Sequence, residues 1–140
     1  MVGKFKSKFD YLNFWVVELT TENFDNVIGQ ENYVIVKFYT KWCGWCRQKA
    51  PEYEKLFDMY KTKRDDIIIA RIEASINEQI SMRYGIYSFP MVVLFFPKDQ
   101  HVHALFQGKR VADMFDMWIQ ANAPALPKKL FAEQLEYLSW

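Results

Sequence analysis

The chain is poor in cysteine, in long apolar runs and in excess charge of either sign. Only two of its 140 residues are cysteine, too few for a small secreted fold built on several disulfides. Its longest apolar run, residues 91–96, reaches about a third of the length that crosses a bilayer. The net charge is +1, with acids and bases interspersed. These absences predict no membrane segment in the chain and no nucleic-acid partner.

The sequence carries no recognisable targeting signal. Its N-terminus lacks the apolar stretch of a signal peptide, and its last residues, YLSW, form no retention signal. We therefore expect either a cytosolic protein or a piece of a longer chain. Pro124 and Pro127 mark a boundary. We predict an N-terminal extension at 1–13, one domain at 14–123, and a helical extension or linker at 124–140.

Hydrophobic residues make up 51% of the chain and aromatic residues 18%, enough for a core that needs neither a metal nor a disulfide. The apolar periodicity predicts strands at 16–19, 33–39, 67–74, 91–96 and 101–106, and helices before Gly29 and at 43–63, 78–84 and 111–121. Pro51 is expected to kink the longest helix. The alternation favours parallel pairing in the first half, and a short connection at 97–100 predicts an antiparallel hairpin. The expected fold is α/β, with a central mixed β-sheet flanked by helices on both faces.

The two cysteines occupy a position that suits redox chemistry. Cys43 directly follows a predicted strand and starts a predicted helix, where unpaired N–H groups and the helix dipole stabilise a thiolate. Cys46 lies one turn deeper on the same side of the helix, within disulfide reach. The spacing therefore predicts an exposed attacking thiol at Cys43 and a buried resolving thiol at Cys46.

Other interpretations of the pair remain open at this point. His101 and His103 share one side of a predicted edge strand and could join the cysteines in a zinc site, although their spacing is not that of a zinc finger. A structural disulfide that closes so short a loop would remove little entropy from the unfolded chain. The cysteines could also be buried without reacting.

Two segments resemble a known family. FYTKWCGWCRQKAPEYEKL, residues 38–56, is similar to the active-site segment of the catalytic domains of protein disulfide isomerases, which carry W-C-G-H-C followed by A-P-E-Y-E-K. YGIYSFPMVVLFF, residues 84–96, resembles the family's cis-proline segment. The resemblance covers about residues 14–122 and implies a thioredoxin fold.

The resemblance implies a role for each matching residue. Cys43 would be the nucleophile that forms a mixed disulfide, and Cys46 the residue that resolves it. Arg110 lies where the family carries a mobile arginine that tunes the resolving thiol. Pro90 is expected to follow a cis peptide bond. The residues expected to contact substrate flank the cysteines and the proline that faces them: Trp42, Gly44, Trp45, Phe89 and Pro90.

Two positions depart from the family pattern. Trp45 replaces the usual histidine, which helps to stabilise the thiolate, so we expect a weaker oxidant than a relative with histidine. Lys37 replaces a buried acid that moves protons for the resolving cysteine, and it faces an otherwise apolar side of its strand. Arg71 lies in the adjacent strand, and Glu73 is the expected acidic partner of these cations. Alternatively, the Lys37 side chain extends to water.

The implied function is thiol–disulfide oxidoreductase or isomerase activity on the cysteines of folding protein substrates. An upstream thiol oxidant or reductase would be a second partner. No metal or organic cofactor is expected, because the dithiol itself carries two electrons. The implied compartment is the endoplasmic reticulum lumen, with the cytosol as the alternative. Two other functions stay open: a cytosolic thioredoxin-like reductase, and a non-catalytic chaperone module whose aromatic surface binds client proteins.

Overall fold

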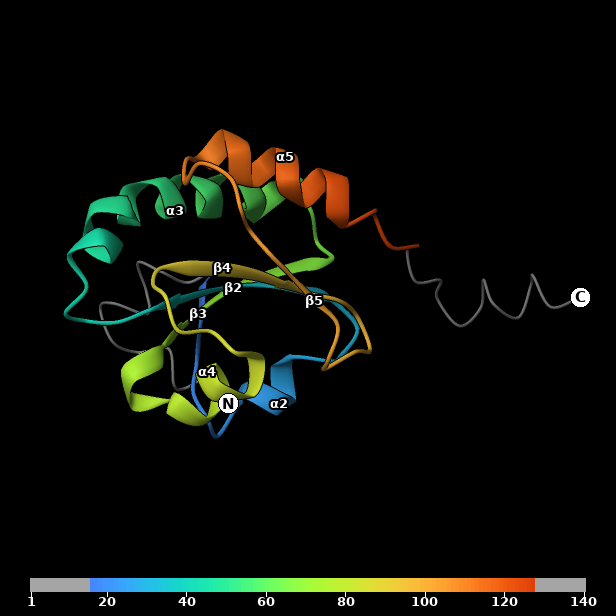
Figure 1. Cartoon of the computed structure of the whole chain (residues 1–140). Helices are drawn as coiled ribbons and strands as arrows, with labels where there is room; N and C mark the ends of the chain where they lie inside the picture. The colour runs from blue at the N-terminus through green and yellow to red at the C-terminus, as the bar shows by residue number, and fades with distance from the viewer. Residues whose placement is uncertain (1–15, 128–140) are drawn as a thin grey trace, which may run out of the picture.

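The centre of the molecule is one mixed five-stranded sheet (Figure 1). Its strands are β1 (Val16–Leu19), β2 (Tyr33–Tyr39), β3 (Ile67–Glu73), β4 (Met91–Phe95) and β5 (His103–Leu105). Across the sheet the order is β1-β3-β2-β4-β5. β1 and β2 run parallel to β3, whereas β4 is antiparallel to β2 and β5 is antiparallel to β4. The predicted parallel first half and the predicted hairpin are confirmed.

Helices cover both faces of this sheet. They are α2 (Phe24–Val27), α3 (Gly44–Lys63), the 3₁₀ turn η2 (Ala74–Ile76), α4 (Glu78–Tyr84) and α5 (Ala112–Asn122). Figure 1 shows α3 and α5 on one face of the sheet and α2 and α4 on the other. The predicted fold class is confirmed. α3 continues through Pro51 as a single helix.

The pleat of β2 sends alternate side chains into two separate cores. Ile35 packs under α3 and α5 in an aromatic core, where Tyr53 contacts Phe57 and Phe115 edge to face. Val36 points to the opposite core, under α2 and α4. The spacing of Tyr53 and Phe57 places both on the buried side of α3. This packing fixes α3 on the sheet, and with it the position at which the helix begins.

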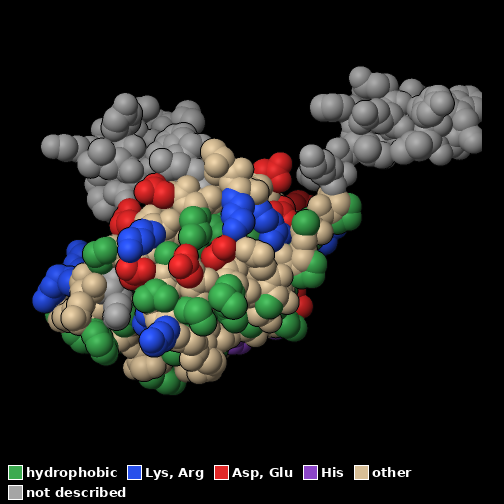
Figure 2. Space-filling model, turned by 90° about the horizontal axis from the view of Figure 1, so that it is seen from above, with side chains coloured by type: hydrophobic (Ala, Val, Ile, Leu, Met, Phe, Trp, Pro, Cys, Tyr) green, Lys and Arg blue, Asp and Glu red, His purple; other side chains and the backbone are tan. Residues whose placement is uncertain are grey.

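The computed structural model describes residues 16–127. The predicted extension at 1–13 and most of the predicted linker at 124–140 lie outside the described residues. No helix within 16–127 has both the length and the apolar character that crossing a membrane requires. Figure 2 looks down on the face that carries α3 and α5, where basic, acidic and hydrophobic side chains are interspersed. This mixture agrees with the nearly balanced charge of the sequence.

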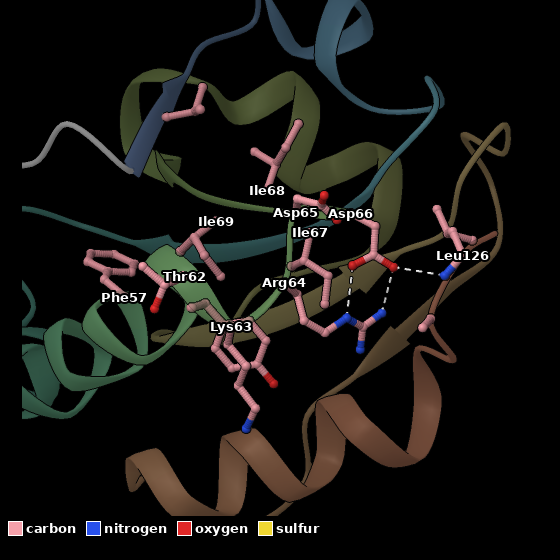
Figure 3. A pocket seen from close by; sticks show the side chains of 13 residues that line it. Phe57, Thr62, Lys63, Arg64, Asp65, Asp66, Ile67, Ile68, Ile69 and Leu126 are labelled. Carbon is pink, nitrogen blue, oxygen red and sulfur yellow. Dashed lines mark hydrogen bonds and ion pairs between the residues drawn. The ribbon is translucent and has the colours of Figure 1, made fainter. Parts of the chain in front are cut away.

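A cavity of about 700 Å³ lies at the start of β3 and the end of α3. Because β2 and β3 are parallel and Cys43 follows the end of β2, this cavity lies at the opposite end of the sheet from the cysteines. Figure 3 shows Arg64 forming two hydrogen bonds, of 2.8 and 2.7 Å, with the Asp66 carboxylate. The same carboxylate accepts a hydrogen bond of 2.9 Å from the Leu126 amide. These contacts tie the segment after α5 to the sheet and involve neither cysteine.

Candidate active site

Both cysteines lie where the central strand β2 leads into α3, and both carry free thiols. Cys43 has extended backbone angles and occupies the N-cap position of the helix. It is partly exposed, whereas Cys46, in the first helical turn, is 5% exposed. The predicted difference in burial between the two thiols is therefore confirmed.

The sulfur of Cys43 caps the helix. Its Sγ accepts a hydrogen bond of 3.0 Å from the backbone N–H of Cys46. One of the unpaired donors of the helix start is satisfied in this way, and a thiolate accepts such a bond more strongly than a thiol does. On its other side, the Cys43 thiol lies 3.8 Å from the carbonyl oxygen of Phe89. The sulfur therefore lies between the helix start and the segment before β4.

Cys46 lies in a less polar place. Burial and, to a lesser degree, the hydrogen bond with Cys43 raise the pKa of its thiol to about 11, while the charge of Lys37 acts in the opposite direction. At pH 7 the Cys46 sulfur is therefore almost entirely protonated. An attack by Cys46 on a mixed disulfide needs a favourable charge nearby or a group that takes up its proton.

The peptide bond between Phe89 and Pro90 is cis, as predicted. It comes directly before β4, which pairs with β2, so the proline segment faces the start of α3. Arg110 donates from Nη2 to the carbonyl oxygen of Pro90 over 2.9 Å. The structure thus places Arg110 against the proline segment, and its influence on the resolving thiol stays a prediction.

Large apolar side chains surround Cys43 and face the solvent. Trp42 is 70% exposed, Trp45 59% and Tyr87 71%. Together with Gly44 and Cys43 they line a cavity of about 550 Å³. A side chain at Gly44 would find no atom within 4 Å, so this side of the nucleophile is open. Exposed apolar surface of this kind marks an interaction site in soluble proteins.

Lys37 lies on the α3 side of β2, near the Tyr53 ring of that helix. Its Nζ is 4.7 Å from the ring centre of Tyr53 and 5.3 Å from that of Tyr39, distances at which a cation and an aromatic ring attract each other. Burial lowers the pKa of Lys37, and the neighbouring Arg71 lowers it further, while the charge of Cys46 raises it. Lys37 is thus a partly buried cation whose charge acts on Cys46.

The prediction that Glu73 pairs with Lys37 and Arg71 is wrong. Arg71 pairs instead with Glu18, with 2.6 Å between Nε and Oε1, and the Tyr39 hydroxyl donates to the same carboxylate over 3.2 Å. The strand register places Glu18, Arg71 and Lys37 side by side across β1, β3 and β2. Sequence reasoning missed Glu18 because the partner of Arg71 depends on strand order, and β1 lies beside β3.

Glu73 instead binds backbone N–H groups near the start of α3 and in η2. Its buried carboxylate accepts hydrogen bonds from the backbone N–H groups of Lys41 at 2.7 Å, Ser75 at 2.7 Å and Ile76 at 3.1 Å. Burial opposes the ionisation of Glu73, but these bonds and the one from the Ser75 hydroxyl outweigh it and hold its pKa below the ordinary value. Because Lys41 comes shortly before Cys43, Glu73 fixes the loop that leads to Cys43.

The histidines do not complete a zinc site with the cysteines. Among residues 16–127, no three side chains of His, Cys, Asp or Glu gather closely enough to hold a metal ion. His103 packs against the rings of Tyr84 and Phe95 instead. Its Nδ1 lies 2.7 Å from the carbonyl oxygen of His101, so the two histidines form a local turn contact.

A dithiol at the start of a helix, faced by a cis-proline beside a five-stranded mixed sheet, defines a thioredoxin-fold domain suited to thiol–disulfide exchange. The family model for thioredoxin matches residues 15–121. The chain therefore belongs to the thioredoxin family, and the resemblance found in the sequence is confirmed.

The curated relatives are protein disulfide isomerases. The chain is 37% identical over 98 residues to probable protein disulfide-isomerase A6 of Medicago sativa, an alignment that covers 70% of this chain and 26% of the relative. It is 32% identical over 108 residues to protein disulfide isomerase-like 2-1 of Oryza sativa subsp. japonica, covering 77% of this chain and 29% of the relative. The chain thus spans 26–29% of the length of these relatives. The solved Trx4 domain of ERdj5 shares the fold, with a TM-score of 0.69 and 24% identity over 80% of this chain and 98% of that domain.

The role of Glu73 can be tested through stability. Replacing Glu73→Gln removes the charged acceptor from a buried cluster of donors and should lower the free energy of unfolding by about 1–2 kcal/mol at pH 7. Because the folded-state pKa of Glu73 is lowered, its contribution is present above the unfolded pKa of about 4.3 and is lost as the pH falls through the folded value. Urea unfolding at pH 7 and between pH 5 and 3 measures both effects.

Glu22→Gln is the control for this prediction, because Glu22 is exposed and the substitution removes the same charge from the surface. It should leave the free energy of unfolding close to that of the wild type. Equal losses in the two variants, or an unchanged pH dependence in Glu73→Gln, would contradict the assignment.

Proposed function

We propose that this domain is a thiol–disulfide oxidoreductase and isomerase that acts on the cysteines of folding proteins through Cys43 and Cys46. The observation that carries the proposal is the position of the Cys43 sulfur. It accepts the Cys46 amide at the helix start, lies beside the cis-proline segment, and opens onto an apolar surface. An accessible nucleophile and a buried second thiol are the two parts that a dithiol exchange requires.

The exchange runs in two steps that balance atoms and electrons. The Cys43 thiolate attacks one sulfur of a substrate disulfide, so that a Cys43–substrate bond forms while the substrate's own S–S bond breaks and releases a thiolate. The Cys46 thiolate then attacks the Cys43 sulfur, forms the Cys43–Cys46 bond and releases the second substrate thiolate. Two electrons pass from the dithiol to the substrate. The reverse sequence oxidises a substrate, and attack by another substrate cysteine isomerises it.

The surroundings of Cys43 suit a protein substrate. Within the described residues, the Phe89 amide donates no hydrogen bond, and it can pair with an extended chain that passes the cis-proline. Trp42 and Trp45 offer apolar area on either side. An upstream thiol oxidant would reoxidise the dithiol to the Cys43–Cys46 disulfide. Relatives named as protein disulfide isomerases support the endoplasmic reticulum lumen as the compartment.

Replacing each cysteine tests the proposed order of attack. Cys43→Ser should lower the rate of insulin reduction by about a hundredfold or more, because serine is not ionised at neutral pH. Cys46→Ala should retain the first step and accumulate a mixed disulfide between Cys43 and the substrate, which mass spectrometry detects. Insulin reduction that survives Cys43→Ser would contradict the catalytic proposal and favour the chaperone module. Turnover coupled to NADPH-dependent thioredoxin reductase would favour the cytosolic reductase.

We further propose that Lys37 assists Cys46 in the second step. The Cys46 thiol is buried and carries a raised pKa, and the Lys37 ammonium is the nearby charge that lowers it. Lys37 stabilises the Cys46 thiolate as it forms, and while charged it accepts no proton. This arrangement replaces proton uptake by a buried acid with electrostatic stabilisation.

Lys37→Met should separate this role from a structural one. The rate of mixed-disulfide resolution at pH 7 should fall by roughly three- to tenfold, and its pH profile should move to higher pH, because the Cys46 thiolate loses a favourable charge. The free energy of unfolding should stay equal or rise, since a buried ammonium is replaced by an apolar side chain. Rapid-quench kinetics measure the rate of resolution, and urea unfolding measures the free energy of unfolding. Lys55→Met, on the exposed side of α3, is the control for the loss of a lysine. An unchanged pH profile in Lys37→Met would contradict a role of Lys37 in the mechanism.

Trp45 should make the dithiol more reducing than it would be with histidine. Indole carries no positive charge at a position 59% exposed beside the nucleophile. Trp45→His should therefore raise the reduction potential by on the order of 30 mV, which is about tenfold in the exchange equilibrium. Equilibration in glutathione buffers measures it, and Trp45→Phe, which keeps an uncharged ring, should leave the potential unchanged. A wild-type potential at or above about −180 mV would refute this proposal.

A further inference from the structure

A second cavity, of about 350 Å³, opens beside the candidate active site, between the end of β2 and α4. Trp42, Tyr87 and Phe89 line both this cavity and the one that contains Cys43, so the two adjoin. We name it the Thr40–Ser81 pocket, after two of the hydroxyl residues that line it. Its volume falls within the range of natural ligand pockets.

Two buried hydroxyl groups of this pocket, those of Thr40 and Ser81, lack partners among the described residues. Thr40 is 2% exposed and Ser81 6%, and within residues 16–127 neither the Thr40 Oγ1 nor the Ser81 Oγ makes a hydrogen bond. A buried hydroxyl without a partner is unfavourable and uncommon in native proteins. Here one of them directly follows β2, the other lies in α4, and both residues line the same pocket. This coincidence indicates that the missing partner is a polar group of a ligand.

The walls and the hydroxyls together select the chemistry of that ligand. Trp42, Tyr87 and Phe89 give the pocket aromatic walls, against which another aromatic ring packs favourably. A phenol hydroxyl both donates and accepts a hydrogen bond, so it can pair with a buried hydroxyl such as that of Thr40 or Ser81 in either role. A phenylalanine would fill the same space and leave both hydroxyls unpaired.

We propose that the Thr40–Ser81 pocket binds the side chain of a tyrosine that lies two residues before or after the reactive cysteine of an extended protein substrate. The proposal rests on the proposed function, because the substrate cysteine must meet Cys43. In an extended chain, side chains two residues apart point to the same side. A substrate segment that pairs with the Phe89 backbone can therefore present its cysteine to Cys43 and its tyrosine to the adjoining pocket. The pocket would give the enzyme a preference among unfolded clients.

Peptide disulfides with glutathione test this specificity. Peptides that carry Tyr, Phe or Ala two residues from the cysteine are reacted with the full chain, and the second-order rate of mixed-disulfide formation is measured. In the wild type the Tyr peptide should react about five- to tenfold faster than the Phe peptide, the value expected for one gained hydrogen bond. Ser81→Ala and Thr40→Val should each lower the rate of the Tyr peptide toward that of the Phe peptide. Thr62→Ala, which removes a hydroxyl from the cavity at the other end of the sheet, should leave the ratio unchanged.

Equal rates for the Tyr and Phe peptides in the wild type, or a ratio unaffected by both pocket variants, would overturn the pocket proposal and assign the hydroxyls to bound water. If no peptide reacts, the proposed function fails. The pocket proposal is then tested separately by measuring peptide binding. For this, the Cys43→Ser variant is titrated with peptides in which serine replaces cysteine, and amide shifts of Ser81 and Tyr87 are followed by NMR. Tighter binding of the Tyr peptide than of the Phe peptide supports the pocket, and equal binding overturns it.

Discussion

The hydrogen bonds of the buried Glu73 carboxylate join the parts on which the candidate site depends. Parallel pairing places the last residues of β2 and β3 opposite each other, with Tyr39 beside Glu73. From there the carboxylate holds the Lys41 amide before the nucleophile and the amides of η2. The start of α3 is fixed as a result, and the Cys43 sulfur meets the Phe89 carbonyl. A buried charged group thus positions the loop that carries Cys43.

The two faces of the sheet carry different parts of the candidate site. On the face under α3, the row of Glu18, Arg71 and Lys37 brings charge close to the buried Cys46. This charge offsets part of the burial that keeps the resolving thiol protonated. The other face carries α4, whose Ser81 closes a pocket next to the nucleophile. The dithiol and the Thr40–Ser81 pocket therefore adjoin where one strand, β2, ends.

Local patterns predicted most of the elements. The bounds of β2 and α4 agree with the expected residues, because β-branched runs and a terminal glycine act over short distances. The 3₁₀ turn η2 was missed, since its start is held by the Glu73 side chain and by no sequence signal of its own. The last strand is shorter than its alternation suggests, with β5 limited to His103–Leu105. Here the pairing with β4 sets the length.

The sequence by itself determined the dithiol, its place between a strand and a helix, and the proline that faces it. Each of these depends on residue identity and on spacing along the chain. Only the tertiary structure decided that Arg71 pairs with Glu18, that Glu73 holds the active-site loop, and that two buried hydroxyls share a pocket. Such contacts join residues far apart in the chain. Their partners follow from strand order and from helix packing on the sheet, which no local pattern encodes.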